Sequence, residues 1–473
     1  MAFSFQIRQR GSTVGREVVG GLTTFMAMSY ILVVQPALLK KAEMDEGGVF
    51  MATCVASAIA CFLMGLMANY PIALAPGMGE NIFFVYTLCA VGAAAGTFKL
   101  SWQEAMALTV AVGVVFVLLA RFGVRSTLLN AIPDALKSGI AAGIGLFIAL
   151  IGFEWGNLIK AKPATFVGLA DLNGNYVAAL TMLGLAIMLV LLALRVRGAI
   201  LLGILAASAA TWAVGRIWNV EAITYHGLLG MPHGLEVTAV GFIKGFESLP
   251  GLLVGQHAAQ VLTLGFVLLF MSVFDTVGTL VAVGSRAELM TKDGKLPAAE
   301  RALTADALGT IAGGCLGTST VTSYIESITG VAAGARTGLA AIVAGLCLLA
   351  AMFFQPLVEM IGGGVRVGTT SDGDPILRYP MIAPALIVVG AMMMRAMREI
   401  EWDDITEALP AFLAMVGMAF TFSIATGIAI GFVSYAFAKL VSGKARQCPA
   451  IVYIFAALFI LQYAVGIATG ALE

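Results

Sequence analysis

Residues 313–330 read GGCLGTSTVTSYIESITG, and they differ from an ordinary membrane-spanning helix because glycine, hydroxyl and β-branched residues dominate them. A second broken stretch spans residues 70–88 and reads YPIALAPGMGENIFFVYTL, with Pro71 and Pro76 ahead of an apolar helical run. Backbone that is not helical is tolerated at membrane depth only where protein buries it or where it lines a cavity. Interrupted segments at corresponding places in two halves of a chain therefore indicate the substrate site of a transporter.

The remainder of the chain is typical of an integral membrane protein. Of its 473 residues, 60% are hydrophobic and 11% are charged, and the mean hydropathy is +0.97. Such values favour lipid as the solvent. A spanning helix needs about 20 apolar residues, and about fifteen candidate segments occur. They are 17–39, 49–69, 71–90, 102–121, 132–152, 176–195, 199–218, 259–283, 302–316, 317–331, 336–356, 381–397, 406–422, 424–441 and 449–469.

The order of these segments predicts two inverted repeats of seven. Each broken stretch is the third segment of its half, counted from segments one and eight. Segment 449–469 is then an additional hydrophobic helix, and the side on which the C-terminus lies stays open. An N-terminus in the cytoplasm places about two thirds of the Lys and Arg residues on the inner side, as the positive-inside rule requires. The long 219–258 loop is expected to fold as an outer cap.

Charge and motifs exclude several other classes of protein. The 27 basic and 27 acidic residues leave no basic face for nucleic acid. The six cysteines have no paired spacing and no nearby histidines, so we expect small core residues and neither a metal site nor a cofactor. Metalloprotease and nucleophile-elbow motifs are absent from the sequence, and Asp372 and Asp374 fall in an outer loop. A membrane-embedded enzyme is therefore disfavoured.

Two carboxylates lie inside apolar segments, where charge is costly and implies function by default. Asp275 lies within VLLFMSVFDTVGTLVAVG (267–284), and Glu326 follows the broken start of segment ten. A carboxyl that changes its protonation with exposure can couple transport to protons. The structural alternative for each is an acid hydrogen-bonded to a neighbouring helix, and it is weaker for Glu326, which adjoins irregular backbone.

Five further polar residues are candidates, and three of them have two interpretations. The amide of Asn81 matches the edge of a nitrogen heterocycle, or it caps or joins helices. Thr279 lies one turn beyond Asp275 and shares the cavity or bonds to backbone. Tyr324 stacks on a planar ligand or packs against a helix. Asp306 is expected at a helix N-terminus, where a carboxylate is favoured, and the role of Glu80 stays open.

These motifs resemble the nucleobase permeases of the uracil/xanthine type, and among them the adenine/guanine/hypoxanthine (AzgA-like) branch. The markers are LAPGMGENIFF (74–84), FDTVGTL (274–280) and GTSTVTSYIESITGVAAGARTG (317–338). The similarity covers most of the chain. One departure is Glu80, where the AzgA-like pattern usually has an apolar residue.

The resemblance implies an all-α fold of fourteen spans, with short strands in segments three and ten. It divides the chain into a core domain (1–125 and 259–360) and a gate domain (126–258 and 361–441), with 442–473 as the additional C-terminal segment. The core slides against the gate, commonly in a homodimer.

The resemblance also assigns the site. Asp275 and Glu326 hold the base, Asn81 carries over from the third segment, and Tyr324 and Ile325 approach the base beside the glutamate, with the backbone N–H as the contact at Ile325. The aspartate at 275 stands where uracil-type members have glutamate and leaves room for a two-ring base.

The sequence thus predicts proton-coupled uptake of purine bases, namely adenine, guanine and hypoxanthine, across the cell membrane by alternating access. The proton is the coupling ion, carried by Asp275 or Glu326. An anion transporter of the same architecture is the main rival, because half-helix N-termini suit chloride, sulfate or bicarbonate. The two acids argue against it.

Overall fold

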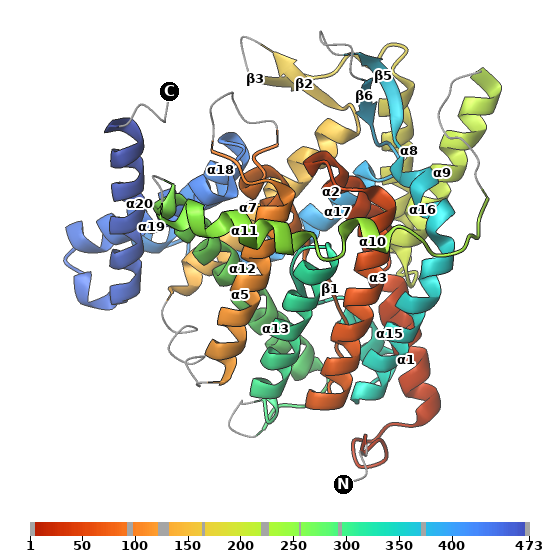
Figure 1. Cartoon of the computed structure of the whole chain (residues 1–473), viewed down its shortest axis with the longest axis horizontal. Coiled ribbons are helices and arrows are strands. Elements are labelled where there is room, and N and C mark those ends of the chain that lie inside the picture. Colours follow the sequence, from red (N-terminus) through yellow and green to blue (C-terminus); the bar gives the residue numbers. More distant parts are fainter. Residues whose placement is uncertain are drawn as a thin grey trace.

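The two broken segments meet at the centre of the molecule. The computed structural model describes residues 5–91, 98–121, 132–162, 166–218, 227–254, 257–291, 296–369 and 375–468. Strand β1 (Leu74–Pro76) precedes helix α4 (Met78–Phe83), and strand β4 (Val321–Ser323) precedes helix α14 (Ser327–Ala332). The two strands pair antiparallel, with Ala75 opposite Thr322 (Figure 1). The short strands predicted in segments three and ten are confirmed.

Long helices surround this central ladder. Those of the first half are α1 (Val14–Met28), α2 (Ile31–Leu39), α3 (Glu46–Leu63), α5 (Trp102–Arg121), α7 (Asp134–Trp155), α8 (Tyr176–Ala193) and α9 (Ala199–Trp218). Those of the second half are α12 (Ala258–Arg286), α13 (Ala299–Leu316), α15 (Gly338–Ala351), α16 (Gln355–Gly362), α17 (Ala383–Met393), α18 (Ile405–Phe420), α19 (Ile424–Val441) and α20 (Ala450–Ala468).

Two sets of helices pack together. Helices α1, α3 and α15 contact one another, and α13 packs against α3 and α5. Helix α7 packs against α17 and α18, and α18 packs against α19. Most elements of the first set belong to the predicted core domain and those of the second set to the predicted gate domain. The division into domains itself stays a prediction.

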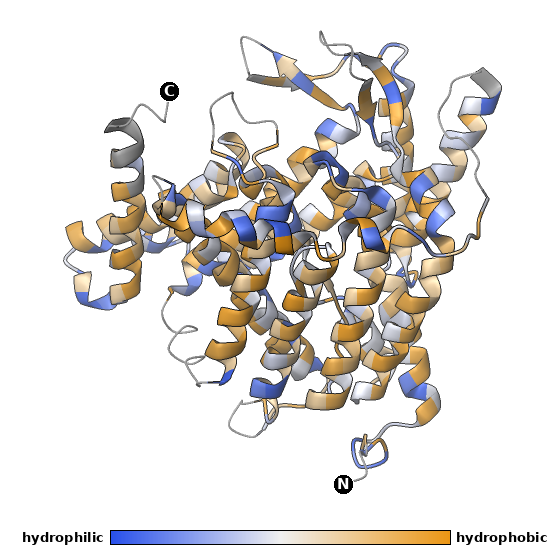
Figure 2. Ribbon diagram, in the orientation of Figure 1, coloured by the Kyte–Doolittle hydropathy of each residue, from blue (hydrophilic) through white to orange (hydrophobic). Residues whose placement is uncertain are grey.

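The described part of the chain contains ten helices that are long and apolar enough to cross a membrane. Apolar residues cover most of the helical surface, whereas hydrophilic ones gather in loops and in the N-terminal segment (Figure 2). The chain is therefore a mostly helical integral membrane protein. The count of fourteen spans and the inverted repeats stay predictions, because several segments are short or interrupted.

Capping residues and glycines set the ends of the helices. The side chain of Asp45 accepts a hydrogen bond from Gly48 N at 2.7 Å and so starts α3. Helix α13 ends at Gly317, whose φ of 96° favours glycine, and the N–H groups of Gly317 and Thr318 both donate to Gly313 O. The chain then turns sharply into β4. Segment ten is broken because this cap stops the preceding helix.

Several loops differ from the expectation. Part of the 219–258 loop forms α10 (Leu235–Thr238) and α11 (Gly241–Val254), and α11 crosses the long helices and packs on α5 (Figure 1). Two hairpins that the sequence did not predict lie at the end of the molecule opposite the N-terminus: β2 (Ile159–Lys162) with β3 (Phe166–Leu169), and β5 (Val365–Thr369) with β6 (Pro375–Arg378). Asp372 and Asp374 lie outside the described residues.

Candidate functional site

The antiparallel ladder fixes the backbone of the site. Tyr324 N donates to Ala73 O at 2.9 Å, and Gly77 N donates to Thr320 O at 3.2 Å, so pairing extends beyond both strands. Tyr324 Oη also donates to Pro76 O at 2.6 Å. Pro76 lacks an N–H, and its place in a two-stranded ladder is one that proline tolerates. The starts of α4 and α14 are therefore held in one rigid unit.

Asp275 lies near the middle of α12 and beside this ladder. Thr322 Oγ1 donates to Asp275 Oδ2 at 3.5 Å, a long bond, and Thr322 also contacts the hydroxyl of Thr276 at 3.0 Å. Asp275 is exposed, although its neighbours Ser272 and Thr276 are completely buried. An exposed acid in the middle of a 29-residue helix borders open space that water or a ligand can enter.

Glu326 faces the same open space from the start of α14. Tyr30 Oη donates to Glu326 Oε1 at 3.0 Å, which fixes one carboxylate oxygen. Glu326 is half-buried, and the side chain of Ile325 is 42% exposed. Asp275 and Glu326 lie close enough for their charges to interact. The structure thus brings together the two acids that the sequence singled out, with Ile325 beside them.

The other three predicted site residues are buried. Asn81 is completely buried, where Ser319 Oγ donates to Asn81 Oδ1 at 2.5 Å and Asn81 Nδ2 donates to Pro76 O at 3.4 Å. Thr279 and Tyr324 are each 5% exposed. These residues lie around the acids, and Asn81 joins the two broken segments. The interpretation of Asn81 as an inter-helix amide therefore has direct structural support.

The prediction for Asp306 is wrong. Helix α13 begins at Ala299, three residues before the expected segment 302–316, so Asp306 lies two turns inside the helix and not at its N-terminus. Its side chain is completely buried, and it accepts hydrogen bonds of 2.7 Å from Thr276 and from Ser323. Asp306 links α12 and α13 to β4 directly behind Asp275. The true start carries no strong signal in the sequence, since Ala298, which precedes the helix, makes no side-chain cap.

Glu80 belongs to the same acidic group. Its side chain is 2% exposed, and it lies within electrostatic range of Asp275 and Asp306. Among the residues that the structure describes, no Lys, Arg or His forms an ion pair with any of the four acids. The site is therefore rich in hydroxyl and carboxyl groups and has no fixed cation.

Exposed residues follow Asp275 along one face of α12. They include Gly278, Val281 and Ser285, which recur every three to four residues and so lie on one stripe of the helix, and Arg286 at the end of the helix is exposed as well. On the other half of α12, Phe266 stacks on Phe455 with ring centroids 3.6 Å apart. Aromatic packing thus covers part of α12 before Asp275, whereas one stripe of the helix after Asp275 is exposed.

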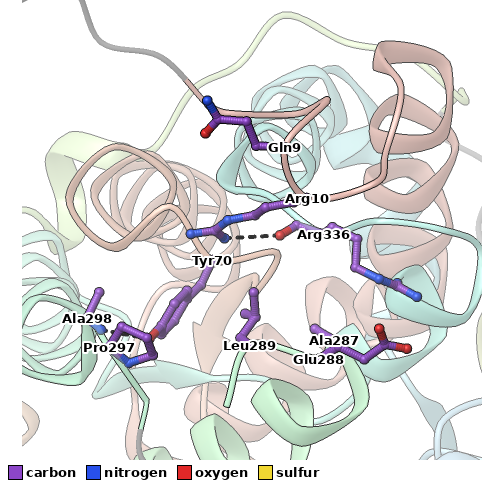
Figure 3. A pocket seen from close by; sticks show the side chains of 9 residues that line it. All are labelled: Gln9, Arg10, Tyr70, Ala287, Glu288, Leu289, Pro297, Ala298 and Arg336. Atoms are coloured by element: carbon purple, nitrogen blue, oxygen red, sulfur yellow. Dashed lines mark hydrogen bonds between the residues drawn. The ribbon is translucent and has the colours of Figure 1, made fainter. Parts of the chain in front are cut away.

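A cavity of about 450 Å³ lies beyond the open end of this stripe. Its lining includes Ala287 and Glu288, which follow α12, together with Arg10, Tyr70 and Arg336 (Figure 3). Arg10 Nη1 donates to Arg336 O at 3.1 Å and ties the N-terminal segment to the bundle. Twelve residues of helix separate Ala287 from Asp275, which is about 18 Å at 1.5 Å per residue. This cavity is therefore distinct from the acidic site.

Paired broken segments that surround buried acids within a helical bundle define a membrane transporter. The chain belongs to the permease family of xanthine/uracil permeases, whose family profile matches residues 15–430. Within this family it is a nucleobase permease of the adenine/guanine/hypoxanthine branch.

Relatives and solved structures agree with this assignment. The chain is 40% identical to the guanine/hypoxanthine permease PbuG of Bacillus subtilis, over 97% of this chain and 98% of the relative. It is 36% identical to the adenine permease AdeP of Escherichia coli, over 97% of this chain and 94% of the relative. The transmembrane domain of the cyanobacterial bicarbonate transporter BicA has a similar fold, with a TM-score of 0.61, 13% identity and coverage of 88% and 96%. At that identity the likeness concerns the fold alone.

Proposed function

We propose that this permease takes up purine nucleobases (adenine, guanine and hypoxanthine) across the cell membrane together with protons. The meeting of Asp275 and Glu326 across an open space is the observation that carries the proposal. Both acids are acceptors when ionised and donors when protonated, which suits the mixed polar edge of a purine. The names of the relatives, which include guanine/hypoxanthine and adenine permeases, support the substrate class.

In the proposed binding mode, Glu326 accepts a ring N–H while Asp275 bonds the opposite polar edge of the base. The backbone N–H of Ile325 is the third contact, and Asn81, Thr279 and Tyr324 complete the surroundings. A proton taken up from the outside by Asp275 or Glu326 reduces the charge of the loaded site. Buried polar groups left unpaired by a wrong base cost about 1–3 kcal/mol each, which gives specificity.

The proposed movement is an elevator, in which the core domain slides against the gate domain. Aromatic contacts of Phe266 and Phe270 with Phe455 and Phe432 cover the first half of α12, and its second half is open. With the N-terminus in the cytoplasm, the open stripe leads inward. Sliding of α12 past these aromatic rings would exchange the covered and open halves.

We also propose the fourteen-span arrangement of two inverted repeats. The antiparallel pairing of β1 with β4 supports it, because corresponding elements of inverted repeats run in opposite directions. The short helices α4 and α14 occupy corresponding positions after these strands. A homodimer completes the proposal.

Uptake by purified protein in liposomes tests this function. We expect saturable uptake of labelled adenine, guanine or hypoxanthine when the outside is acidic, competition by unlabelled purines, and loss of accumulation when an ionophore collapses the pH gradient. Uracil, sulfate and bicarbonate serve as competitors of other classes. Transport of bicarbonate or sulfate without transport of any purine would replace this proposal by an anion transporter.

A further inference from the structure

Glu80 has an environment that a structural role does not explain. It lies in the first turn of α4, and its side chain is 2% exposed. Its Oε1 has no hydrogen-bond partner among the described residues. A Cβ at Gly77 would overlap Glu80 Oε2, so this second oxygen folds back over the start of α4. A buried oxygen without a partner is costly and points to a missing ligand.

The groups that face Glu80 are acidic or neutral. They are Asp275 of α12, Asp306 of α13 and Tyr324 after β4. Helix α2, which also packs on α4, has no charged residue, and α7 presents Ile144 to Gly79. The nearest cation on α7 is Lys137, which pairs with Asp134 at 2.8 Å and lies over the ring of Phe274. Among the described residues around Glu80, none forms an ion pair with it, so a proton is the remaining way to neutralise its charge.

Asp306 provides a comparison within the same cluster. Each of its oxygens accepts a hydrogen bond from a hydroxyl group, so its ionised form is supported by two donors. Glu80 Oε1 has no such donor. When the acids compete for ionisation, Asp306 is thus the better supported anion, and its charge disfavours a second one at Glu80.

From this arrangement we propose that Glu80 is an additional proton carrier, which adds one proton to the load that accompanies each base. The inference rests on the proposed function. On the outer side the carboxylate of Glu80 takes up a proton and becomes a neutral carboxylic acid, and on the inner side it returns that proton to water. No other bond changes.

A physical link ties this proton to the base. Without a base, water reaches the exposed Asp275 and screens its charge from Glu80. A bound base displaces that water, which lowers the local dielectric and strengthens the repulsion between the two acids. Base binding therefore favours protonation of Glu80, and by linkage protonation favours base binding. This mutual preference is the requirement for symport.

An additional coupled proton raises the highest ratio of inside to outside base that the transporter can reach. Each coupled proton multiplies the largest possible ratio of inside to outside base by about ten per pH unit of gradient. This limit depends on the number of protons per base and not on the amount or speed of the transporter. A variant that carries one proton fewer per base can therefore be distinguished from a variant that is only poorly folded.

The test compares Glu80→Gln with the wild type in liposomes, with the membrane potential held at zero and a gradient of one pH unit. Glutamine mimics the protonated acid but cannot release a proton. We expect Glu80→Gln to bind purine and to reach a final accumulation about tenfold lower than that of the wild type. Glu80→Leu, which restores the apolar residue usual at this position, should show the same loss.

Glu17→Gln is the matched control. Glu17 is also a completely buried glutamate of the helical bundle, but both its oxygens accept backbone hydrogen bonds, from Arg336 N at 2.9 Å and Thr337 N at 3.1 Å. Its accumulation limit should equal that of the wild type. A second measurement counts the protons released inside per labelled base with a pH dye. This count should fall by one in Glu80→Gln and Glu80→Leu and stay unchanged in Glu17→Gln.

The outcomes separate the two proposals. If the wild type accumulates purine with the pH gradient and Glu80→Gln reaches the same limit with the same proton count, Glu80 stays protonated throughout and the inference is overturned. A wild type that does not respond to the pH gradient, or that follows a sodium gradient, contradicts the proposed proton coupling itself. A lower limit and a lower proton count in Glu80→Gln alone support the inference.

Discussion

The two broken segments have the same backbone plan and different chemistry. Each has a three-residue strand followed by a six-residue helix, and the strands pair with each other. After β4, Ile325 and Glu326 reach the open space beside Asp275. After β1, Glu80 and Asn81 are buried, and Asn81 bonds to Ser319 and to Pro76. The tenth segment therefore has side chains that are partly exposed, whereas the polar side chains of the third segment are buried behind them.

This difference shows why a repeated backbone does not imply repeated roles. Ser319 has a φ of 84°, a left-handed conformation that is unfavourable for serine. Its hydroxyl bonds to Asn81, and Gln35 Nε2 donates to the same hydroxyl at 3.2 Å. Strained backbone of this kind persists only where its surroundings hold it. The polar residues of segment three thus stabilise the geometry that segment ten uses.

Glu326→Gln should have the largest effect on function. The substitution removes the carboxylate that the proposal gives to the ring N–H, and a hydrogen bond to a charged group is worth about 1.5–3 kcal/mol. We expect purine binding to weaken by about 10- to 100-fold and accumulation to be lost. Equilibrium binding of labelled purine measures this directly. Tyr30→Phe, which removes only the donor to Glu326 Oε1, is the milder control. Unchanged binding in Glu326→Gln would contradict the role of segment ten.

Asn81→Ala should affect stability more than purine binding, which is the opposite of Glu326→Gln. It removes the acceptor of the Ser319 hydroxyl, which leaves one buried donor unpaired at a cost of about 1–3 kcal/mol, whereas the carbonyl of Pro76 keeps its hydrogen bond from Tyr324. We expect a lower unfolding temperature in detergent and a smaller loss of purine affinity than in Glu326→Gln. Ser319→Ala should lower the unfolding temperature in the same direction. If Asn81→Ala unfolds like the wild type but loses binding, Asn81 is the direct base contact that the sequence predicted.

The sequence predicted the helical segments and the central acids well, and it predicted hydrogen-bond partners poorly. Hydropathy and the broken motifs located the apolar helical segments, the two strands and the acids Asp275 and Glu326, because these features are local in the chain, whereas the count of fourteen spans stays a prediction. It misplaced Asp306 since a helix start depends on residues such as Ala299 that carry no strong signal. The hydrogen bonds of Asn81 and the hairpin β2–β3 depend on side chains and strands that meet only in the folded chain.

The two faces of α12 also differ in exposure, which can be tested by cysteine labelling. Gly278 is exposed with nothing within 4 Å of an added Cβ, whereas its neighbour Thr279 is 5% exposed. Gly278→Cys should therefore react with a small water-soluble thiol reagent several times faster than Thr279→Cys, and bound purine should slow the reaction at 278. The native cysteines are buried or half-buried, and the wild type gives their background. Equal rates at the two positions would mean that the open stripe is not accessible in the membrane.

The smallest effect is expected for substitution of Asp404, a carboxylate outside the site. Asp404 precedes α18, and Lys444 donates to it at 2.7 Å. The hydrogen bonds from Lys444 and Thr406 hold the pKa of Asp404 well below its usual value. Because the pKa is depressed in the folded protein, this contribution to stability is fully present above the unfolded pKa of about 3.9 and is lost progressively as the pH falls from there through the depressed folded pKa. Asp404→Asn should therefore lower the unfolding temperature slightly at pH 7 and by less at pH 3, with purine binding at pH 7 unchanged, since solvent and salt screen such a pair. A loss of binding in Asp404→Asn as large as in Glu326→Gln would show that acids outside the membrane also control the site, and the division between supporting and ligand-facing segments would then be incomplete.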